Sequence, residues 1–383
     1  MRILNVNATL DAVWGGGGAE RIRRLSCALA RQGHQVTILT TGFDSATFST
    51  LRLAAVDVVA LKCLNKRFML PVMPLVQLRR LVNDHDVIHL CGHWTLLNVV
   101  IYFLAQIARK PYVVSPVGTL PRFGRSQKLK MVYNLLAGRA LIRNAHAHIA
   151  VTPKEIDQFA EYGVDTSRVL VIPNGVDTEA FNAVDSQQFR TRHALGTAPL
   201  ILFMGRLNPI KGPDLLVAAF LQIADQFPSY LLVLAGPDEG MGASLRESAQ
   251  QHGFSDRVRI ISYVGGEEKT AAYRAATLLV IPSRQEAMSI VVLEGGAAGT
   301  PVLITDQCGF DVVAEIGGGM VVAAEATAIA AGLVSMLSES GKLLEAGERL
   351  RNFVQRDFTW DVAASRLINV FETVLGGSAV LRG

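Results

Sequence analysis

Short hydrophobic runs alternate with longer amphipathic segments along the whole chain. In the first half, the runs predicted to form β-strands lie at 3–7, 36–40, 56–61, 87–90, 112–115, 148–151 and 169–172. A second series lies at 200–204, 231–235, 258–262, 278–281, 302–305 and 320–322. Helix-length segments separate successive runs, and this alternation is typical of βαβ units with parallel strands. The pattern therefore predicts an α/β protein with two doubly wound sheets.

The length of the chain agrees with two domains. Its 383 residues exceed one ordinary core and suit two domains of about 150–200 residues, which implies a central cleft that both domains face. Pro173-Asn174-Gly175 ends the first series of runs, and the polar stretch 184–199 has no strong core pattern. We therefore expect one domain at 1–185 and a second at 186–357.

The composition is that of a globular protein, with 50% hydrophobic and 18% charged residues. The chain opens on a strand-like run without a charged leader and cleavage site, so we expect a cytoplasmic protein. The longest uncharged stretch, 90–108, is interrupted by Asn98 and Gln106. It is predicted to contain a strand end, a turn and a buried helix, because a spanning helix needs roughly 20 apolar residues.

The cysteines indicate neither a metal site nor a disulfide framework. They lie far apart without a paired C-x-x-C spacing, at Cys27, Cys63, Cys91 and Cys308. We therefore expect reduced cysteines and no bound metal.

Charge is distributed unevenly along the chain. Residues 1–185 contain 21 Lys or Arg and 13 Asp or Glu, a net +8, whereas the remainder contains 16 and 20, a net −4. A basic first half suits an anionic partner, such as a lipid surface or a phosphate-bearing acceptor. An ordinary charged surface explains the same numbers equally well.

A glycine-rich segment follows the first strand and leads into a helix. Gly16, Gly17 and Gly18 would let the backbone approach a ligand and direct helix N-terminal amides at an anion. The spacing is not that of a dinucleotide-binding loop, because the third glycine position falls on Glu20 or Arg21. The glycine-rich segment alone is a weak signal of ligand binding, and a flexible loop is the alternative interpretation.

Two cations share one strand-to-helix loop in the second half. Arg206 and Lys211 follow the run 200–204, and Pro213 suits the first turn of the next helix. A guanidinium and an ammonium at this position could hold a diphosphate. Two solvated surface charges are the alternative.

A pair of glutamates follows the run 278–281. Glu286 is expected in the loop and Glu294 in the second turn of the next helix, where its apolar neighbours predict burial. Carboxylates accept hydrogen bonds from vicinal hydroxyls, such as those of a ribose and a hexose. The amides of Met288, Ser289 and Ile290 at the helix start could meet a diphosphate.

Taken together, these motifs resemble glycosyltransferase family 4, the "group 1" class of retaining GT-B enzymes, over nearly the whole chain. A late Trp360-Asp361 before a helix resembles the segment that crosses back to the first domain in such enzymes, here 358–383. The other matching segments are Gly16-Gly17-Gly18-Ala19-Glu20-Arg21, Ile172-Pro173-Asn174-Gly175-Val176-Asp177, Gly205-Arg206 with Lys211-Gly212, Glu286-x7-Glu294, Gly299-Thr300-Pro301-Val302 and Asp306-Gln307-Cys308-Gly309.

The resemblance implies a role for each matched position. Arg206 and Lys211 would bind the donor diphosphate and stabilise the leaving group, Glu286 would bind the donor sugar, and Glu294 the nucleotide ribose. The glycine segment 16–18 would close over the phosphates. Such enzymes bind the acceptor in the first domain and the nucleotide sugar in the second. They retain the anomeric configuration, generally without a metal, and no cofactor is expected.

The sequence departs from the family pattern at two places. Family members commonly have a histidine where this chain has Val117, which leaves open whether the equivalent function is lost or supplied elsewhere. After Glu286, the commoner glycine, aromatic and glycine are replaced by Ala287-Met288-Ser289. This second change is expected to alter the fit of the sugar.

The acceptor side is only weakly indicated. His93 and Trp94 follow the run 87–90, and Gly118 follows Val117, so these residues are candidates for the acceptor side. A lone histidine is more often structural than functional. Asp84-His85-Asp86 superficially resembles a metal-binding motif, but it precedes its strand and is expected at the opposite edge of the sheet.

The leading hypothesis is transfer of a hexose from a nucleotide sugar to a glycan or lipid-linked saccharide, without a nucleic-acid partner. The alternatives are a non-catalytic sugar-nucleotide-binding subunit and a GT-B-shaped epimerase. Release of free nucleoside diphosphate would separate the first hypothesis from the others.

Peripheral contact with the inner membrane leaflet is a further hypothesis. Lys62, Lys66, Arg67, Arg79 and Arg80 surround apolar residues in 62–80, and a second basic group contains Arg122, Arg125, Lys128 and Lys130. The alternative is a helix with a buried apolar face and a solvated basic rim.

Overall fold

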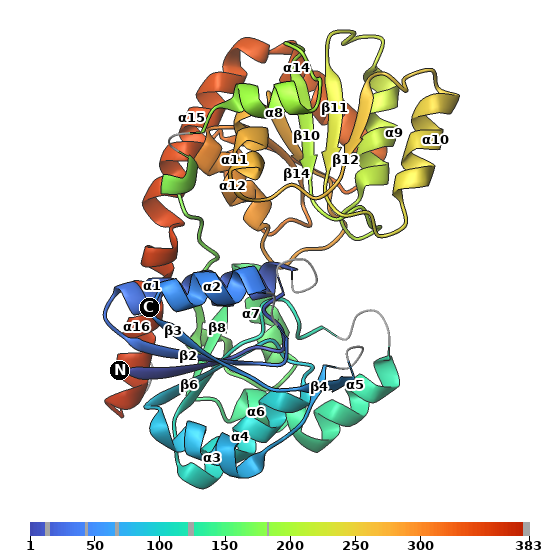
Figure 1. The fold of residues 1–383 in the computed structure, drawn as a ribbon. Helices are drawn as coiled ribbons and strands as arrows, with labels where there is room; N and C mark the ends of the chain where they lie inside the picture. The colour runs from blue at the N-terminus through green and yellow to red at the C-terminus, as the bar shows by residue number, and fades with distance from the viewer. Residues whose placement is uncertain (12–15, 43–44, 66–68, 122–125, 182–183, 378–383) are drawn as a thin grey trace. The chain divides into compact units, whose positions relative to one another are not determined.

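A computed structural model describes residues 1–11, 16–42, 45–65, 69–121, 126–181 and 184–377. The chain divides into two compact units (Figure 1). The first contains Met1–Gly175 and Trp360–Gly383, and the second contains Val176–Thr359.

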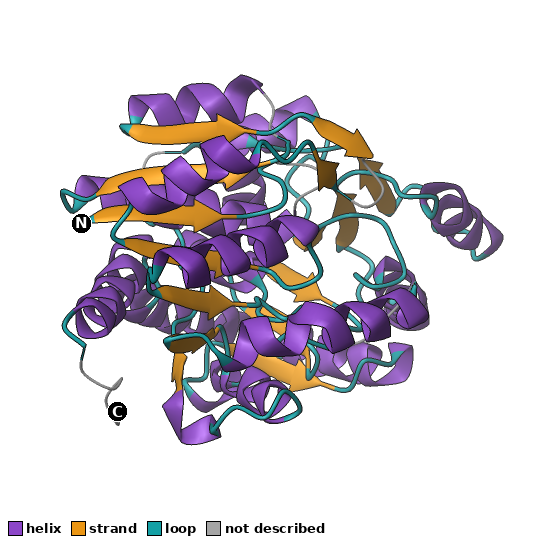
Figure 2. Cartoon of the chain, turned by 90° about the horizontal axis from the view of Figure 1, so that it is seen from below, coloured by secondary structure: helices purple, strands orange, loops and turns teal. Residues whose placement is uncertain are grey.

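The first unit is built on a seven-stranded sheet with the order β3-β2-β1-β6-β7-β8-β9, in which every pairing is parallel. Helices cover the strands, as Figures 1 and 2 show. The strands are β1 (Arg2–Val6), β2 (Gln35–Thr40), β3 (Val56–Ala60), β6 (Val87–Cys91), β7 (Tyr112–Ser115), β8 (Ala147–Ala150) and β9 (Val169–Val171). The helices are α1 (Gly16–Arg31), α2 (Ser45–Leu53), α3 (Leu75–Asp84), α4 (Leu96–Ala108), α5 (Gln127–Tyr133), the π-helix η1 (Asn134–Gly138), α6 (Arg139–Arg143), α7 (Pro153–Ala160) and α16 (Trp360–Leu375).

The second unit contains a six-stranded parallel sheet with the order β12-β11-β10-β13-β14-β15. Its strands are β10 (Leu200–Met204), β11 (Leu231–Ala235), β12 (Val258–Ile261), β13 (Leu278–Ile281), β14 (Val302–Thr305) and β15 (Gly319–Val322). Its helices are α8 (Ser186–Arg192), α9 (Pro213–Ile223), α10 (Gly242–Gln251), α11 (Gly266–Ala275), α12 (Ile290–Ala298), α13 (Val312–Glu315), α14 (Ala326–Ser338) and α15 (Ser340–Asp357). Short 3₁₀ turns lie at η2 (Thr166–Arg168) and η3 (Glu179–Phe181).

Both sheets have the predicted doubly wound topology. In each, the first two connections run outward in one direction before the chain returns to the other side of the first strand. The central strands are buried along their length, as β6 and β10 illustrate, because helices cover both faces of a parallel sheet. The strand series at 3–172 and 200–322 is therefore confirmed, each run within a residue or two of its predicted ends.

The division between the units differs slightly from the sequence-based boundaries at 185 and 357. Val176 forms an isolated parallel bridge with Thr359, and its N–H donates to the carbonyl of Phe358. The two segments at which the chain passes from one unit to the other, near 176 and 359, are therefore paired with each other. Residues 176–185 thus belong to the second unit. Helix α16 packs on α1 within the first unit, where Arg31 contacts Asp361 at 2.9 Å.

The uncharged stretch 90–108 forms the end of β6, a turn at Gly92 and helix α4, as predicted. Within the described part of the chain, no helix is long and apolar enough to cross a membrane. The antiparallel pair β4 (Cys63–Asn65) and β5 (Leu70–Pro71) was not predicted, because its strands are too short to give an alternating pattern.

Candidate functional site

Two loops of the second unit follow neighbouring strands, β10 and β13. These are the strands at which the direction of winding reverses, and doubly wound folds bind ligands beyond the carboxyl ends of such strands. Arg284 joins the two loops, since its N–H donates to the Ile210 carbonyl at 2.8 Å and its guanidinium pairs with Asp214. The loops that carry the predicted donor-site residues are therefore fixed to each other.

Gly212 allows these loops to pack closely. It has a left-handed backbone, with φ of 68°, and a Cβ there would lie 2.1 Å from the carbonyl oxygen of Pro282. No side chain fits at that distance, so the glycine of the Lys211-Gly212 motif is required sterically. Helix α9 begins at Pro213, as predicted.

Arg206 is held by a carboxylate on a third loop. Its Nη1 lies 3.0 Å from Oε1 of Glu239, which follows β11. The other oxygen of Glu239 accepts a hydrogen bond from Asn208 Nδ2 at 2.7 Å. About a third of the Arg206 side chain is exposed, so a ligand can reach the guanidinium in this position. Sequence reasoning missed Glu239 and Asn208, whose only signal is their place after a strand.

Lys211 and Glu286 form an ion pair. Lys211 Nζ lies 2.9 Å from Glu286 Oε1, and the same oxygen accepts a hydrogen bond from Ser283 Oγ at 2.6 Å. The Glu286 side chain is only 9% exposed, whereas that of Lys211 is 25% exposed. The structure thus brings together two residues that the sequence placed in separate motifs.

Glu294 lies in the second turn of α12 and is buried, as predicted. Its two partners come from α11: Lys269 Nζ lies 2.5 Å from Oε1, and the Tyr273 hydroxyl donates to Oε2 at 2.6 Å. Burial, with the charge of Glu294 beside it, raises the pKa of Tyr273 well above its usual value. The tyrosine therefore stays a neutral donor, and the expectation that a buried carboxylate needs partners is confirmed. Neither partner was foreseen.

The start of α12 shows how the predicted diphosphate-binding amides are placed. The amide of Ser289 donates to the Cys308 carbonyl at 3.0 Å, so a diphosphate would compete with this carbonyl for it. Ser289 is the N-cap residue, and its buried Oγ has no hydrogen-bond partner among the described atoms. Met288 is 6% exposed, and α12 begins at Ile290.

In the first unit, Gly16, Gly17 and Gly18 form the first residues of α1, after β1. Gly16 has a left-handed backbone, and open space surrounds the Cβ position of both Gly16 and Gly18. The preceding residues of the glycine-rich segment lie outside the described part of the chain.

Arg21 connects two motifs that lie about 150 residues apart in sequence. It is 2% exposed, and its guanidinium donates to the carbonyls of Ile172 and Pro173 at 2.9 Å and to Asn174 Oδ1 at 3.0 Å. Burial lowers the pKa of Arg21 to about 10, so the side chain remains charged at neutral pH. Both segments, 16–21 and 172–177, belong to the family resemblance, but the contact between them was not predicted.

Val117, which stands where a histidine is usual, has an unfavourable backbone. Its φ is 53°, a left-handed value that is costly for a β-branched residue, and Gly118 follows at 72°. The Gly118 N–H donates to Oε1 of buried Glu155 at 2.5 Å, and Val151 N–H donates to Oε2 at 2.7 Å. Burial raises the pKa of Glu155. Such strain persists where surrounding contacts enforce it, and it is frequent at functional sites.

His93 and Trp94 differ in accessibility. His93 is 1% exposed, its Nε2 lies 2.9 Å from Asn134 Oδ1, and burial lowers its pKa to about 4. Its ring packs edge-on against Trp94 at 4.4 Å, and Lys130 Nζ lies 5.1 Å from the Trp94 ring centre. His93 is thus buried beside the more accessible Trp94, and the assignment of both residues to the acceptor side stays a prediction.

The segment Asp84-His85-Asp86 lies before β6, as predicted. Asp86 accepts two hydrogen bonds from Arg2, and His85 is buried against Thr37. These contacts give the segment a structural role at the strand entry.

Comparison with known proteins agrees with this geometry. The family model for glycosyl transferases group 1 matches residues 185–355, and the model for glycosyltransferase family 4 matches 15–180. A D-inositol 3-phosphate glycosyltransferase of Streptomyces bingchenggensis is 32% identical over 317 residues, which cover 78% of this chain and 69% of the relative. The chain belongs to glycosyltransferase family 4.

Other relatives extend the match to full length. An uncharacterized glycosyltransferase of Methanocaldococcus jannaschii is 27% identical over 379 residues, covering 94% of this chain and 95% of the relative. The curated relatives differ in length. The match to the D-inositol 3-phosphate glycosyltransferase of Nocardia farcinica covers only 54% of that relative.

The solved structures show the GT-B fold. HepE of Anabaena in complex with UDP-glucose has a TM-score of 0.79 and 19% identity, with 97% of this chain and all of that chain covered. As a family 4 glycosyltransferase, this chain has Arg206, Lys211, Glu286 and Glu294 within the group 1 match, and Gly16–18 and Arg21 within the family 4 match.

Proposed function

We propose that the protein transfers a hexose from a nucleoside diphosphate sugar to a glycan or a lipid-linked saccharide, with retention of anomeric configuration and without a metal. The observation that carries this proposal is the grouping of Arg206, Lys211 and Glu286 on fixed loops beyond β10 and β13. The family assignment and the motif matches agree with it.

The two cations would act on the leaving group. Negative charge accumulates on the nucleoside diphosphate as the glycosidic bond breaks, and positioned cations stabilise this charge most in the transition state. Glu239 and Glu286 hold Arg206 and Lys211 in place before a donor arrives. The phosphates would then share these cations with the carboxylates, so little rearrangement is needed. Two protein cations supply the charge that metal-dependent transferases take from an ion.

The carboxylates would bind the two sugars of the donor. Glu286 accepts bonds through Oε1 from Ser283 and Lys211, which leaves its remaining lone pairs for hydroxyls of the hexose. Glu294 is held by Lys269 and Tyr273 in a position that suits the ribose hydroxyls. The HepE structure is a complex with UDP-glucose, which makes UDP sugars the first donors to test.

Donor binding is testable by thermal shift against the common sugar nucleotides. A donor at 100 times its dissociation constant should stabilise the wild-type protein by about 2.7 kcal/mol. In Glu294→Ala, the ribose would lose a charged acceptor, a change of about 1.5–3 kcal/mol or tenfold or more in donor affinity. The Tm shift at the same donor concentration should therefore be much smaller.

Glu247→Ala is the matched control for this experiment, since it removes an exposed carboxylate from α10 of the same unit. It should show the wild-type shift. Equal donor affinity in Glu294→Ala and the control would place Glu294 outside the site, and no shift with any sugar nucleotide would count against the proposed function.

We extend the proposal to peripheral contact with an anionic membrane surface. In α3, Leu78 and Val82 are buried, but Leu75 and Val76 are 57% and 68% exposed. Arg79 is exposed on the same helix. Helix α3 therefore has the expected buried apolar face. A second face of the same helix, which is both apolar and basic, is exposed to solvent. Lys66, Arg67, Arg122 and Arg125 lie outside the described residues.

Vesicle co-sedimentation tests this contact. Each cation near an anionic surface contributes about 1 kcal/mol, so Arg79→Glu with Arg80→Glu should weaken binding by about thirtyfold or more at low salt. Arg259→Glu with Lys342→Glu changes the charge equally on the second unit and should have little effect. A wild-type protein that stays in the supernatant with anionic vesicles would contradict the proposal.

A further inference from the structure

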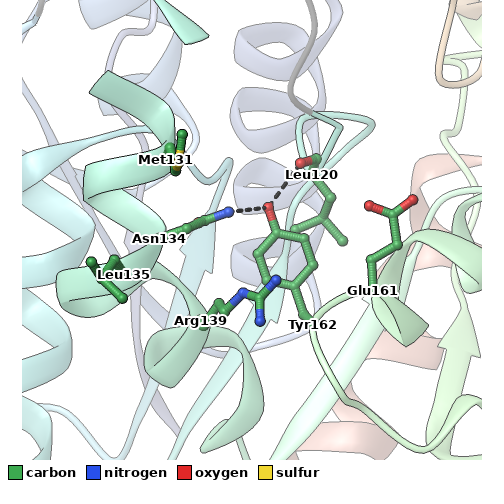
Figure 3. A pocket seen from close by; sticks show the side chains of 7 residues that line it. All are labelled: Leu120, Met131, Asn134, Leu135, Arg139, Glu161 and Tyr162. Atoms are coloured by element: carbon green, nitrogen blue, oxygen red, sulfur yellow. Dashed lines mark hydrogen bonds between the residues drawn. The ribbon is translucent and has the colours of Figure 1, made fainter. Parts of the chain in front are cut away.

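The first unit contains a pocket of about 340 Å³ between the α5–η1 segment and the end of α7 (Figure 3). Leu120, from the loop after β7, lines one side. The remaining lining residues are Met131, Asn134, Leu135, Arg139, Glu161 and Tyr162. The pocket is thus formed by one loop and two helical segments of the unit that would receive the acceptor.

A π-helical turn fixes the floor of the pocket. Asn134 begins η1 and is bonded on both sides, to His93 through Oδ1 at 2.9 Å and to the Tyr162 hydroxyl through Nδ2 at 3.0 Å. Tyr162 in turn donates to the Leu120 carbonyl at 2.8 Å. A Cβ at Gly138 would lie 2.5 Å from Asn134 Oδ1, so any larger residue there would displace the Asn134 side chain. π-helical turns are rare and often occur at functional sites.

Two opposite charges face this pocket without partners. Arg139 and Glu161 line it from α6 and the end of α7, and Figure 3 shows both side chains beside the Tyr162 ring. Across the described residues, neither has a hydrogen bond or an ion pair, in contrast to the cations of the donor site. A guanidinium offers donors and a carboxylate offers acceptors, which suits a neutral ligand with several hydroxyls. The two charges cancel, so the pocket has no net attraction for an anion.

The pocket also has an apolar side that continues onto the surface. Met131 and Leu135 line the pocket and are 54% and 82% exposed, and Leu136 on the same turn is 75% exposed. Together these three large side chains form an exposed apolar patch beside the pocket, a feature that often marks a binding surface. The ligand should therefore combine hydroxyls with a hydrocarbon chain.

We propose that this pocket binds the neutral sugar of an alkyl- or prenyl-linked glycoside. Arg139 and Glu161 would hold the sugar hydroxyls, and the chain would leave over Met131, Leu135 and Leu136. The inference rests on the proposed function, because it assigns the pocket to a lipid-linked acceptor. It adds that the acceptor carries an uncharged saccharide next to its chain.

The test is saturation-transfer NMR with octyl β-glucoside, below its micelle concentration, and methyl β-glucoside. The octyl compound should bind at least about tenfold more tightly, which corresponds to the burial of two methylene groups. Arg139→Ala and Glu161→Gln should each weaken octyl glucoside binding by about tenfold or more, since each removes a hydrogen bond to a charged group. Both side chains are exposed, so both variants should fold.

Matched controls come from α5 and α7, close to the two test positions in sequence. Lys128→Ala removes an exposed cation of α5 and Asp157→Asn an exposed carboxylate of α7, and neither lines the pocket. Both should bind as the wild type does. Unchanged binding in Arg139→Ala and Glu161→Gln, equal weakening in the controls, or displacement of the glycoside by inorganic phosphate would each overturn the proposal.

The same samples are titrated with the sugar nucleotide that stabilises the wild type. A donor shift without glycoside binding rejects the pocket assignment and leaves the proposed function standing. Glycoside binding without any donor shift would support the pocket assignment and count against the proposed function.

Discussion

Replacing Arg206 or Lys211 by alanine is expected to reduce turnover by a hundredfold or more while the protein remains folded. Loss of one such charged donor typically raises the barrier by on the order of 3 kcal/mol, because its contribution is greatest in the transition state. Each variant leaves Glu239 or Glu286 without its cation, which further disfavours an approaching diphosphate.

The measurement is release of free nucleoside diphosphate in the presence of donor and acceptor. A fall in kcat that exceeds the change in donor affinity would assign the cations to the leaving group. Arg259→Ala, which removes an exposed arginine from the edge strand β12, should retain wild-type rates. Wild-type rates in Arg206→Ala and Lys211→Ala would reject the assignment. A wild-type protein that binds donor but releases no diphosphate would favour a binding subunit or an epimerase.

Arg21→Ala is expected to destabilise the first unit by about 3 kcal/mol. The substitution removes three hydrogen bonds from a buried charged group and leaves the carbonyls of Ile172 and Pro173 without their donor. For a domain of this size, the loss corresponds to a fall in Tm of roughly 6–12 °C. Arg21→Lys should recover only part of it, because an ammonium cannot reproduce the planar arrangement of donors.

Thermal unfolding followed by circular dichroism checks this prediction. The control is Arg24→Ala on the same helix, whose side chain is 40% exposed and pairs with Glu20 at 2.8 Å. An exposed pair of this kind contributes less than about 1 kcal/mol, so its Tm should stay close to that of the wild type. If Arg21→Ala and Arg24→Ala have the same Tm, Arg21 does not anchor the segment 172–174.

Hydrophobic periodicity was sufficient to predict the architecture and the placement of the motifs. Strands buried on both faces require continuous apolar runs, and runs such as 200–204 and 278–281 fall on β10 and β13 within a residue. The loops after such strands could then be named, because parallel strands end at a common edge. That reasoning placed Arg206, Lys211 and Glu286 on these loops, and Glu294 in the helix that follows, from the sequence alone.

The contacts between side chains, in contrast, follow from tertiary packing and could not be predicted. Glu239, Lys269 and Tyr273 come from segments whose local pattern carries no sign of their partners, and the amide of Ser289 turned out to be satisfied by Cys308. The contact of Arg21 with 172–174 likewise joins segments about 150 residues apart. Periodicity reports which face of an element is buried, whereas hydrogen-bond partners depend on how whole elements pack against one another.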